Sequence, residues 1–263
     1  TAQVFTSGHG SCEEDWWGGS AVANGLGYRD IALYVDGRVA GFAPVFPTLF
    51  TGGWGPDNWR PIVSPRTIDL RPYVLDLTAF VPLLTDGRPH SFALGMGGFA
   101  QSCTNDHWYA AANLLVHTNP LSRARTTGTM TTYTTDGLVM DDPSGQGLQG
   151  TAAHHLRVVS TVHPARMPAA VVTTTDSSDA TIAAAAAAVN SAWTWVTGTT
   201  VTTGGHSYTA TSTATYGFRR AGQVWTFQDD WHRVLGKDAV AGYEAQVAQA
   251  MRSVGVFNLG VDG

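Results

Sequence analysis

The sequence predicts an all-β protein made of jelly-roll-like antiparallel β-sandwiches. Asp-Gly pairs between apolar runs predict hairpins, because this dipeptide fits the tight turn that joins antiparallel strands. Threonine-rich alternation after Arg125 is typical of pleated, half-exposed strands. Many short strands with turn residues between them indicate a sandwich, a barrel or a jelly roll.

Two Asp-Gly pairs, Asp36-Gly37 and Asp86-Gly87, each lie between apolar runs in the first third of the chain. Each pair predicts a hairpin. Glycine and proline are spread through this part, which argues against long helices. The strands expected here cover residues 31–35, 39–42, 81–84, 90–94 and 110–116, with the tail of an earlier strand at Val4-Phe5.

The second half is expected to continue as strands, with two ambiguous segments. The alanine run 183–188 has high helix propensity, but we interpret it as a strand. Residues 239–251 fit a short helix or a final strand equally well. A change of composition near 121–123 predicts two domains, 1–120 with the candidate site and 121–263 as a second β-sandwich or sheet. The other expected strands cover 129–133, 155–162, 169–175, 191–196, 208–218 and 224–227.

Composition excludes some classes of partner. The chain has 263 residues, a formal net charge of -5 and only 13% charged residues, so it lacks the basic footprint of a nucleic-acid-binding protein. No apolar run reaches the roughly 18 residues of a membrane span, and we expect no signal peptide within this sequence. Cys12 and Cys103 fit one disulfide in an oxidising compartment, or else two buried thiols. We therefore expect a secreted or otherwise extracytoplasmic protein, either mature or cut from a longer chain.

Three consecutive acids, Glu13, Glu14 and Asp15, precede Trp16 and Trp17. Neighbouring carboxyls raise one another's pKa, so one acid group can donate a proton while another accepts one. Indole rings stack on the C–H faces of sugars. In a strand, Glu13 and Asp15 share one face and Glu14 and Trp16 the other, which makes these pairs rival sites. The alternative is a solvated loop whose acids cap turns.

A glycine- and proline-rich loop over 51–61 carries Trp54, Asp57, Trp59 and Arg60. Such a loop is suited to a sugar site, with a tryptophan stacking and the arginine holding a carboxylate or carbonyl oxygen. In the alternative interpretation, Trp59 fills the core and Arg60 pairs with a local acid.

A third segment, 105–109, contains Trp108 and follows Cys103. A Cys12–Cys103 disulfide would bring it beside the acid cluster. Histidines lack the spacing of metal ligands, and no nucleophile elbow, phosphate-binding loop or dinucleotide fingerprint is present. We therefore expect neither a metal nor a cofactor. The predicted substrate-binding residues are Asp15, Trp16, Trp54, Asp57, Trp59, Arg60 and Trp108.

Taken together, the motifs over residues 8–118 resemble the acidic peptide-N-glycanases of the almond type, the peptide-N4-(N-acetyl-β-glucosaminyl)asparagine amidase A family. The resemblance begins at Gly10–Trp17, which is similar to the family's Gly-Cys-Glu-Glu-x-Trp pattern. Ser11 is inserted in that pattern, and Asp15 replaces an aromatic residue. The other matching stretches are 34–41, 44–47, 50–53, 59–61, 76–80, 83–92 and 112–114.

The resemblance implies hydrolysis of the amide that joins the first GlcNAc of an N-glycan to asparagine, on N-glycosylated peptides or proteins. It implies Glu13 and Glu14 as catalytic carboxylates, Trp16, Trp59 and Arg60 as substrate contacts, a jelly-roll sandwich and no metal. An acidic pH optimum follows if one carboxyl keeps a raised pKa. Family members carry a β-rich segment before the motif, so we expect a second chain from the same precursor to supply it.

Two other functions fit the same residues. A carbohydrate-binding β-sandwich without catalysis would use the aromatic rings alone, since a fold does not fix a function. A glycoside hydrolase would also use two carboxylates.

Overall fold

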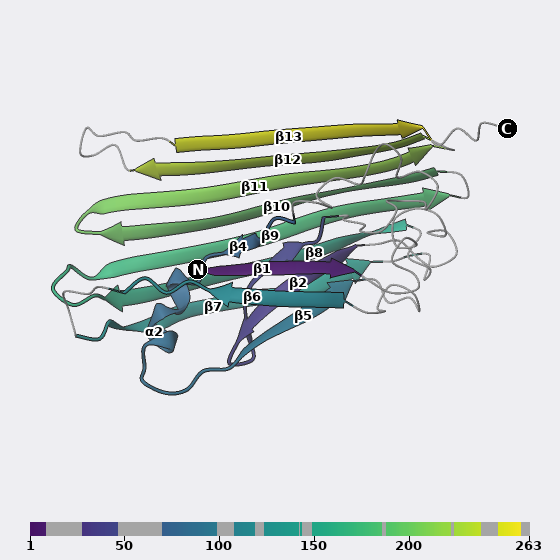
Figure 1. Ribbon diagram of the computed structural model, residues 1–263. Coiled ribbons are helices and arrows are strands. Elements are labelled where there is room, and N and C mark those ends of the chain that lie inside the picture. Colours follow the sequence, from purple (N-terminus) through teal and green to yellow (C-terminus); the bar gives the residue numbers. More distant parts are fainter. Residues whose placement is uncertain are drawn as a thin grey trace.

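The computed structural model describes residues 1–8, 28–46, 70–98, 108–118, 124–141, 143, 149–185, 188–221, 224–237 and 247–258 (Figure 1). These residues form an all-β, antiparallel structure, as the sequence predicts. The strands are β1 (Ala2–Gly8), β2 (Arg29–Val35), β3 (Arg38–Pro44), β4 (Tyr73–Leu75), β5 (Phe92–Gly98), β6 (Trp108–Leu114), β7 (Thr127–Asp141), β8 (Gln149–His163), β9 (Ala170–Ala185), β10 (Ala188–Thr203), β11 (His206–Ala221), β12 (Val224–Lys237) and β13 (Val247–Asn258). A 3₁₀ turn, η1 (Thr78–Phe80), leads into the short helix α2 (Val81–Leu84).

The described strands form three sheets. Strands β7 to β13 make a seven-stranded antiparallel meander in chain order. A three-stranded sheet of order β3-β2-β5, which we call the middle sheet, packs on one face of this meander. The other three-stranded sheet, of order β4-β1-β6, lies on the far side of the middle sheet, in front in Figure 1. The face of the meander toward the middle sheet is called its inner face below, and the opposite face its outer face.

The middle sheet is covered on both sides. Almost every residue of β2 and β3 is buried, instead of every second one, which indicates that both faces of these strands are packed. Phe42 stacks on His154 of β8, with ring centroids 3.6 Å apart, on the side of the meander. On the other side, a Cβ added at Gly41 would lie 3.2 Å from the Leu75 Cβ of β4. The glycine therefore lets the sheets approach closely.

The long strands of the meander alternate between buried and exposed residues. In β8, every second residue from Ala152 to Val162 is buried, and in β9 every second one from Ala170 to Ala180. This period of two is what a strand with one packed face requires. Threonines occupy much of the outer face, for example Thr200, whose hydroxyl bonds that of Thr209 at 3.0 Å.

The first predicted hairpin is confirmed. Strands β2 and β3 pair across Asp36 and Gly37, whose φ angles of 49° and 76° are those of a tight turn with two left-handed residues. The alanine run is also a strand over 183–185, paired with Val189, Asn190 and Ala188 of β10. Residues 247–251 belong to β13, so the strand alternative is correct there.

The second predicted hairpin is wrong. Val81–Leu84 is helical, and β5 pairs with β2 at the centre of the middle sheet. Pro82 lies in the first turn of the helix, where its missing N–H costs nothing. Before it, the Asp76 carboxylate accepts the Thr78 N–H at 2.9 Å and starts the η1 turn.

The strands of the second half are long, which corrects the expectation of many short ones. Of the segments predicted separately at 169–175 and 183–188, residues 170–175 and 183–185 belong to one 16-residue strand, β9, whose central Asp176 and Ser178 interrupt the apolar pattern, while Ala188 begins β10. Both polar side chains are buried and hydrogen-bonded, so the strand continues through them. One cluster of buried side chains contains residues of both halves, from Ala2 to Tyr216. The division into domains at residue 120 stays a prediction.

Candidate functional site

The candidate catalytic and loop residues lie outside the described residues. This applies to Cys12, Glu13, Glu14, Asp15 and Trp16 in segment 9–27 and to Cys103 in segment 99–107. It applies equally to Trp54, Asp57, Trp59 and Arg60 in segment 47–69. The roles of these residues and the disulfide therefore stay predictions. The structure does describe the strands from which each of the three segments departs.

All three segments depart from one end of the sheets, which we call the site end. Gly8, the last residue of β1, lies opposite Trp108, the first residue of β6. In the middle sheet, Arg29 at the start of β2 lies opposite Gly98 at the end of β5. The two sheets meet at this end, because the Thr6 hydroxyl lies 3.8 Å from the Met96 Sδ.

The loop segment belongs to the same end. It follows β3, whose Pro44 pairs with Asp30 near the start of β2. It returns to β4, whose first residue Tyr73 pairs with Val4 of β1. The topology thus brings the strand ends that flank the acid cluster, the tryptophan loop and the Cys103 segment to one end of the sheets (Figure 1). The sequence alone does not show this convergence.

Trp108 is the one predicted site residue that the structure describes. It is half-buried, packs against the core and pairs with Gly8 at the site end. The acid cluster lies outside the described residues, so the predicted place of Trp108 beside that cluster and its proposed contact with substrate both stay predictions.

A buried polar cluster lies beneath the site end, where β2 and β3 cross β8 and β9. The Asp30 carboxylate bonds the His154 Nδ1 at 2.7 Å, and both side chains are buried. The Tyr28 hydroxyl bonds the Ser178 hydroxyl at 2.7 Å. Arg29 is buried beside them and donates to the Tyr28 carbonyl at 2.6 Å. The cluster consists of Tyr28, Arg29, Asp30, His154, Asp176 and Ser178.

Asp176 is the second buried carboxyl of this cluster. It accepts the Phe42 backbone N–H at 2.9 Å and the Trp195 indole N–H at 2.6 Å. Burial raises the pKa of Asp176 to about 8, although both hydrogen bonds favour its charged form. The group is therefore a neutral acid at neutral and acidic pH, in which form it links the middle sheet to the meander.

Burial also changes the other groups of the cluster. It raises the pKa of the Tyr28 hydroxyl, with Asp30 adding to the effect, and lowers the pKa of Arg29 to about 10. The His154 Nε2 is buried with no hydrogen-bond partner among the described residues. These groups are buried and their hydrogen bonds join β2 and β3 to β8 and β9, so the cluster orients β2, the strand that follows the acid segment. Substrate does not reach these buried side chains, so they take no direct part in proton transfer to it.

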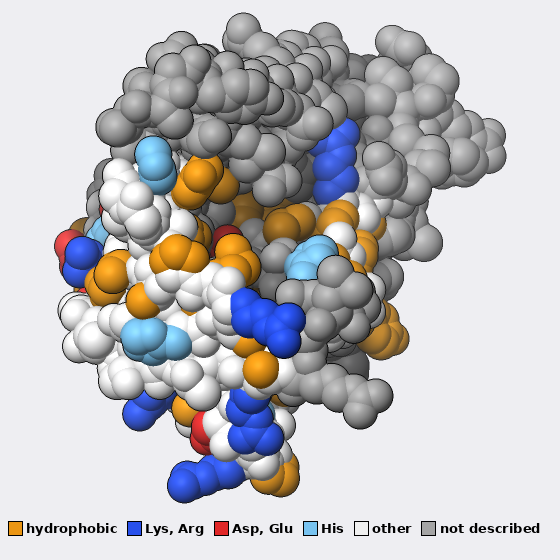
Figure 2. Space-filling view, turned by 90° about the vertical axis from the view of Figure 1, so that its left-hand side faces the viewer, with side chains coloured by type: hydrophobic (Ala, Val, Ile, Leu, Met, Phe, Trp, Pro, Cys, Tyr) orange, Lys and Arg blue, Asp and Glu red, His pale blue; other side chains and the backbone are white. Residues whose placement is uncertain are grey.

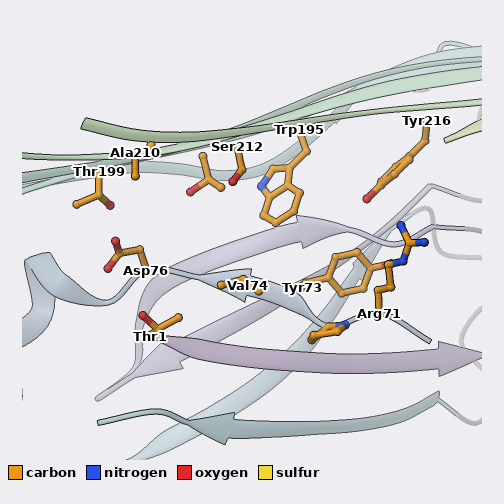
Figure 3. A pocket seen from close by; sticks show the side chains of 13 residues that line it. Thr1, Arg71, Tyr73, Val74, Asp76, Trp195, Thr199, Ala210, Ser212 and Tyr216 are labelled. Carbon is orange, nitrogen blue, oxygen red and sulfur yellow. The ribbon is translucent and has the colours of Figure 1, made fainter. Parts of the chain in front are cut away.

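A groove of about 420 Å³ lies between β4 and the inner face of β10 and β11 (Figure 3). Trp195, Ser212 and Thr199 project from the meander toward Tyr73 and Asp76 on the opposite side. A hollow with hydrophobic side chains inside it is visible on the face shown in Figure 2. The groove is lined by Thr1, Arg71, Pro72, Tyr73, Val74, Asp76, Trp195, Thr197, Gly198, Thr199, Ala210, Ser212 and Tyr216.

Sequence reasoning missed the polar cluster and the groove. Asp176 and Ser178 lie two residues apart in one strand, and Trp193 and Trp195 do so in the next. Residues two apart in a strand share one face, so these pairs were the sequence feature from which the cluster and the groove could have been predicted. Within the described residues, no group of three histidines, cysteines or acids is placed to hold a metal ion. No helix in that part of the chain is long and apolar enough to cross a membrane.

Comparisons with known proteins agree with the resemblance seen in the motifs. The sequence model of the family described as peptide N-acetyl-β-D-glucosaminyl asparaginase amidase A matches residues 1–136. Peptide-N4-(N-acetyl-β-glucosaminyl)asparagine amidase A of Prunus dulcis, the almond, is 33% identical over 125 residues. This alignment covers 47% of the chain and 21% of the almond protein, so the chain spans about a fifth of that relative's length. No solved structure matches the chain.

Proposed function

The chain belongs to the peptide N-acetyl-β-D-glucosaminyl asparaginase amidase A family, and from this premise we propose that it hydrolyses the glycan–asparagine amide of N-glycosylated peptides or proteins. The name of the almond relative describes this reaction. Water adds to the amide carbonyl carbon and the bond to nitrogen breaks. The peptide keeps an aspartate, and the glycan leaves as a glycosylamine.

The observation that carries the proposal is the convergence of three strand-end pairs at the site end. The acid segment departs after Gly8 and returns at Tyr28, while the tryptophan loop departs after Phe46 and returns at Leu70. An amide hydrolase that acts on a glycan needs carboxylates and aromatic rings close together. Because the strands that flank both segments end at the same place, we infer that the two segments act on one substrate.

In the proposed mechanism, one of Glu13 and Glu14 is ionised and removes a proton from the attacking water. The other is protonated and donates to the leaving nitrogen. Arg60 stabilises the negative charge that develops on the carbonyl oxygen. Trp16 and one of Trp54 and Trp59 hold the GlcNAc, and Asp15, Asp57 and Trp108 contact other parts of the substrate. An acidic pH optimum follows, because the donor must keep its proton.

Separate Glu13→Gln and Glu14→Gln variants test the assignment. Glutamine keeps the shape of glutamate but neither accepts nor donates the proton, so we expect each variant to lose at least about a hundredfold in glycan release. Mass spectrometry of the peptide product measures the reaction. Asp141→Asn, a change at an exposed acid in β7, is the matched control and should keep its activity.

Full activity in both glutamine variants would exclude the two glutamates as acid and base. Sugar left on the asparagine would indicate a glycoside hydrolase, and an unchanged glycopeptide would indicate a binding module. Secretion, the Cys12–Cys103 disulfide and a second chain with the β-rich segment are further parts of the proposal. Intact mass of the natively purified protein, with and without reduction, tests the disulfide and the second chain together.

A further inference from the structure

The groove beside β4 exists because the middle sheet is narrower than the meander. The middle sheet ends at β3, whereas the inner face of the meander continues over β10 and β11. Beyond β3, Tyr73 of β4 reaches the meander directly and meets Trp195 edge to face, with ring centroids 6.2 Å apart. Phe46, which follows β3, packs edge to face against Tyr216, with ring centroids 5.2 Å apart, and bounds the groove on the side of β3.

The aromatic side chains of the groove are held in fixed orientations. Trp195 donates its indole N–H to Asp176, and the Tyr73 hydroxyl accepts the Phe46 backbone N–H at 2.7 Å. Tyr216 is held between Phe46 and Trp193 by edge-to-face contacts. Tyr73 and Trp195 are 5% exposed and Tyr216 is 2% exposed, so each ring presents only a small, rigid edge to the groove. Such edges suit contact with the C–H groups of a sugar ring at a low cost in side-chain entropy.

Polar groups surround these rings. Thr197 pairs with Ser212 across β10 and β11, and Thr199 pairs with Ala210 one step further along the groove. Asp76 lies toward the Thr199 end, while Arg71 lies toward Tyr216 (Figure 3). One acid and one base at separated positions favour a neutral ligand with many hydroxyl groups over a strongly charged one.

The volume and the strand geometry favour a sugar over a peptide. The groove volume of about 420 Å³ falls within the roughly 300–1,000 Å³ of small-molecule sites. A peptide that added to the edge of β4 would find only three strand residues, Tyr73–Leu75, preceded by a proline that has no N–H. Few main-chain hydrogen bonds are therefore available to it.

We propose that this groove is a second carbohydrate-binding site that takes a neutral oligosaccharide. Its Arg71 end lies next to the point where the tryptophan loop returns to β4, so the groove continues from the site end along β4. The identity of the ligand rests on the proposed function: the groove binds the part of the N-glycan beyond the GlcNAc whose amide is cleaved. The groove then selects substrates by the sugars that follow this first GlcNAc.

The test is calorimetric binding of the free trimannosyl-chitobiose core of N-glycans, an oligosaccharide without any scissile amide. Ala210→Phe fills the groove from β11 and should weaken binding at least about tenfold. Thr209→Phe places the same ring on the exposed outer face one residue away and should bind as the wild type does. Ser212→Leu, a smaller obstruction at a half-buried position, carries the test if Ala210→Phe does not fold.

Three results would overturn the proposal. These are no binding by the wild type, equal binding by the wild type and a folded groove-filling variant, and displacement of the oligosaccharide by an unglycosylated peptide. The measurement needs no catalysis, so it stands apart from the proposed function. If amide cleavage is absent and the oligosaccharide still binds, the proposed function fails and the groove site remains. If cleavage occurs, Ala210→Phe should raise KM for the full N-glycan far more than for a single GlcNAc on asparagine.

Discussion

Two adjacent histidines, one on each face of the meander, make the same kind of hydrogen bond to an aspartate, but one pair is buried and the other is exposed. His154 on the inner face bonds Asp30 through Nδ1 at 2.7 Å, and His155 on the outer face bonds Asp136 through Nδ1 at 2.8 Å. The side chains of the inner pair are 3% and 2% exposed, those of the outer pair 48% and 45%. Water therefore competes for the outer pair only, so breaking a hydrogen bond of nearly the same length costs a different free energy on each face.

Removing each histidine should give the largest difference between the faces. His154→Ala leaves the Asp30 carboxylate buried without its partner and removes the ring that stacks on Phe42, so we expect a loss of about 3–5 kcal/mol in the free energy of unfolding. His155→Ala exposes Asp136 to water and should cost within about 1 kcal/mol. Urea unfolding followed by tryptophan fluorescence measures both. Equal losses in the two variants would show that burial does not decide the strength of these pairs.

The inner face should also make stability depend on pH. The pKa of Asp176 is about 8 in the folded protein, well above the roughly 3.9 of an unfolded aspartate. Between these values the folded state holds a proton that the unfolded state has lost. The contribution is thus complete below the unfolded pKa and disappears as pH rises toward 8, by up to about 1.4 kcal/mol per pH unit.

Asp176→Asn is the variant that isolates this contribution. The amide does not titrate, so its unfolding free energy should fall less steeply than that of the wild type between pH 5 and pH 8. The variant is also expected to be less stable, because an amide that faces two N–H donors accepts from only one of them. Parallel slopes in the two proteins would remove Asp176 as the source of the pH dependence.

Two adjacent serines repeat the comparison on a smaller scale. Ser178 is fully buried on the inner face and bonds the Tyr28 hydroxyl, whereas Ser177 belongs to the outer face. Ser178→Ala leaves a buried phenol without this partner and should cost about 1–3 kcal/mol. Ser177→Ala should change stability by about 0.5 kcal/mol or less. Thermal unfolding resolves the two cases, and equal melting temperatures would contradict the assignment of the faces.

These contrasts also explain how far the sequence predicts the fold. The Asp36-Gly37 hairpin follows from local turn chemistry, so it was found. The Val81–Leu84 segment reads as a strand from its apolar residues, but Pro82 and the bond from Thr78 to Asp76 make it helical. The length of β9 was missed because Asp176 and Ser178 resemble the end of a strand until their partners on β3 and before β2 are known.

The candidate site divides in the same way. Glu13, Glu14 and Trp16 lie close together in the sequence, so their chemical roles can be predicted from it. Only strand pairing shows that the strand ends flanking their segment and those flanking the tryptophan loop lie at one end of the sheets. The groove brings Tyr73 against Trp195, 122 positions apart in the numbering, and only the packing of separate sheets shows such a contact.

If this chain lets water attack the amide between an N-glycan and asparagine, the peptide product takes up an oxygen atom from that water. The most direct test is incubation of the wild-type protein with a glycopeptide in water labelled with heavy oxygen, followed by mass spectrometry of the peptide. We expect a sugar-free peptide whose former asparagine is an aspartate with one labelled oxygen. A peptide that keeps its asparagine, with or without sugar attached, would contradict this expectation.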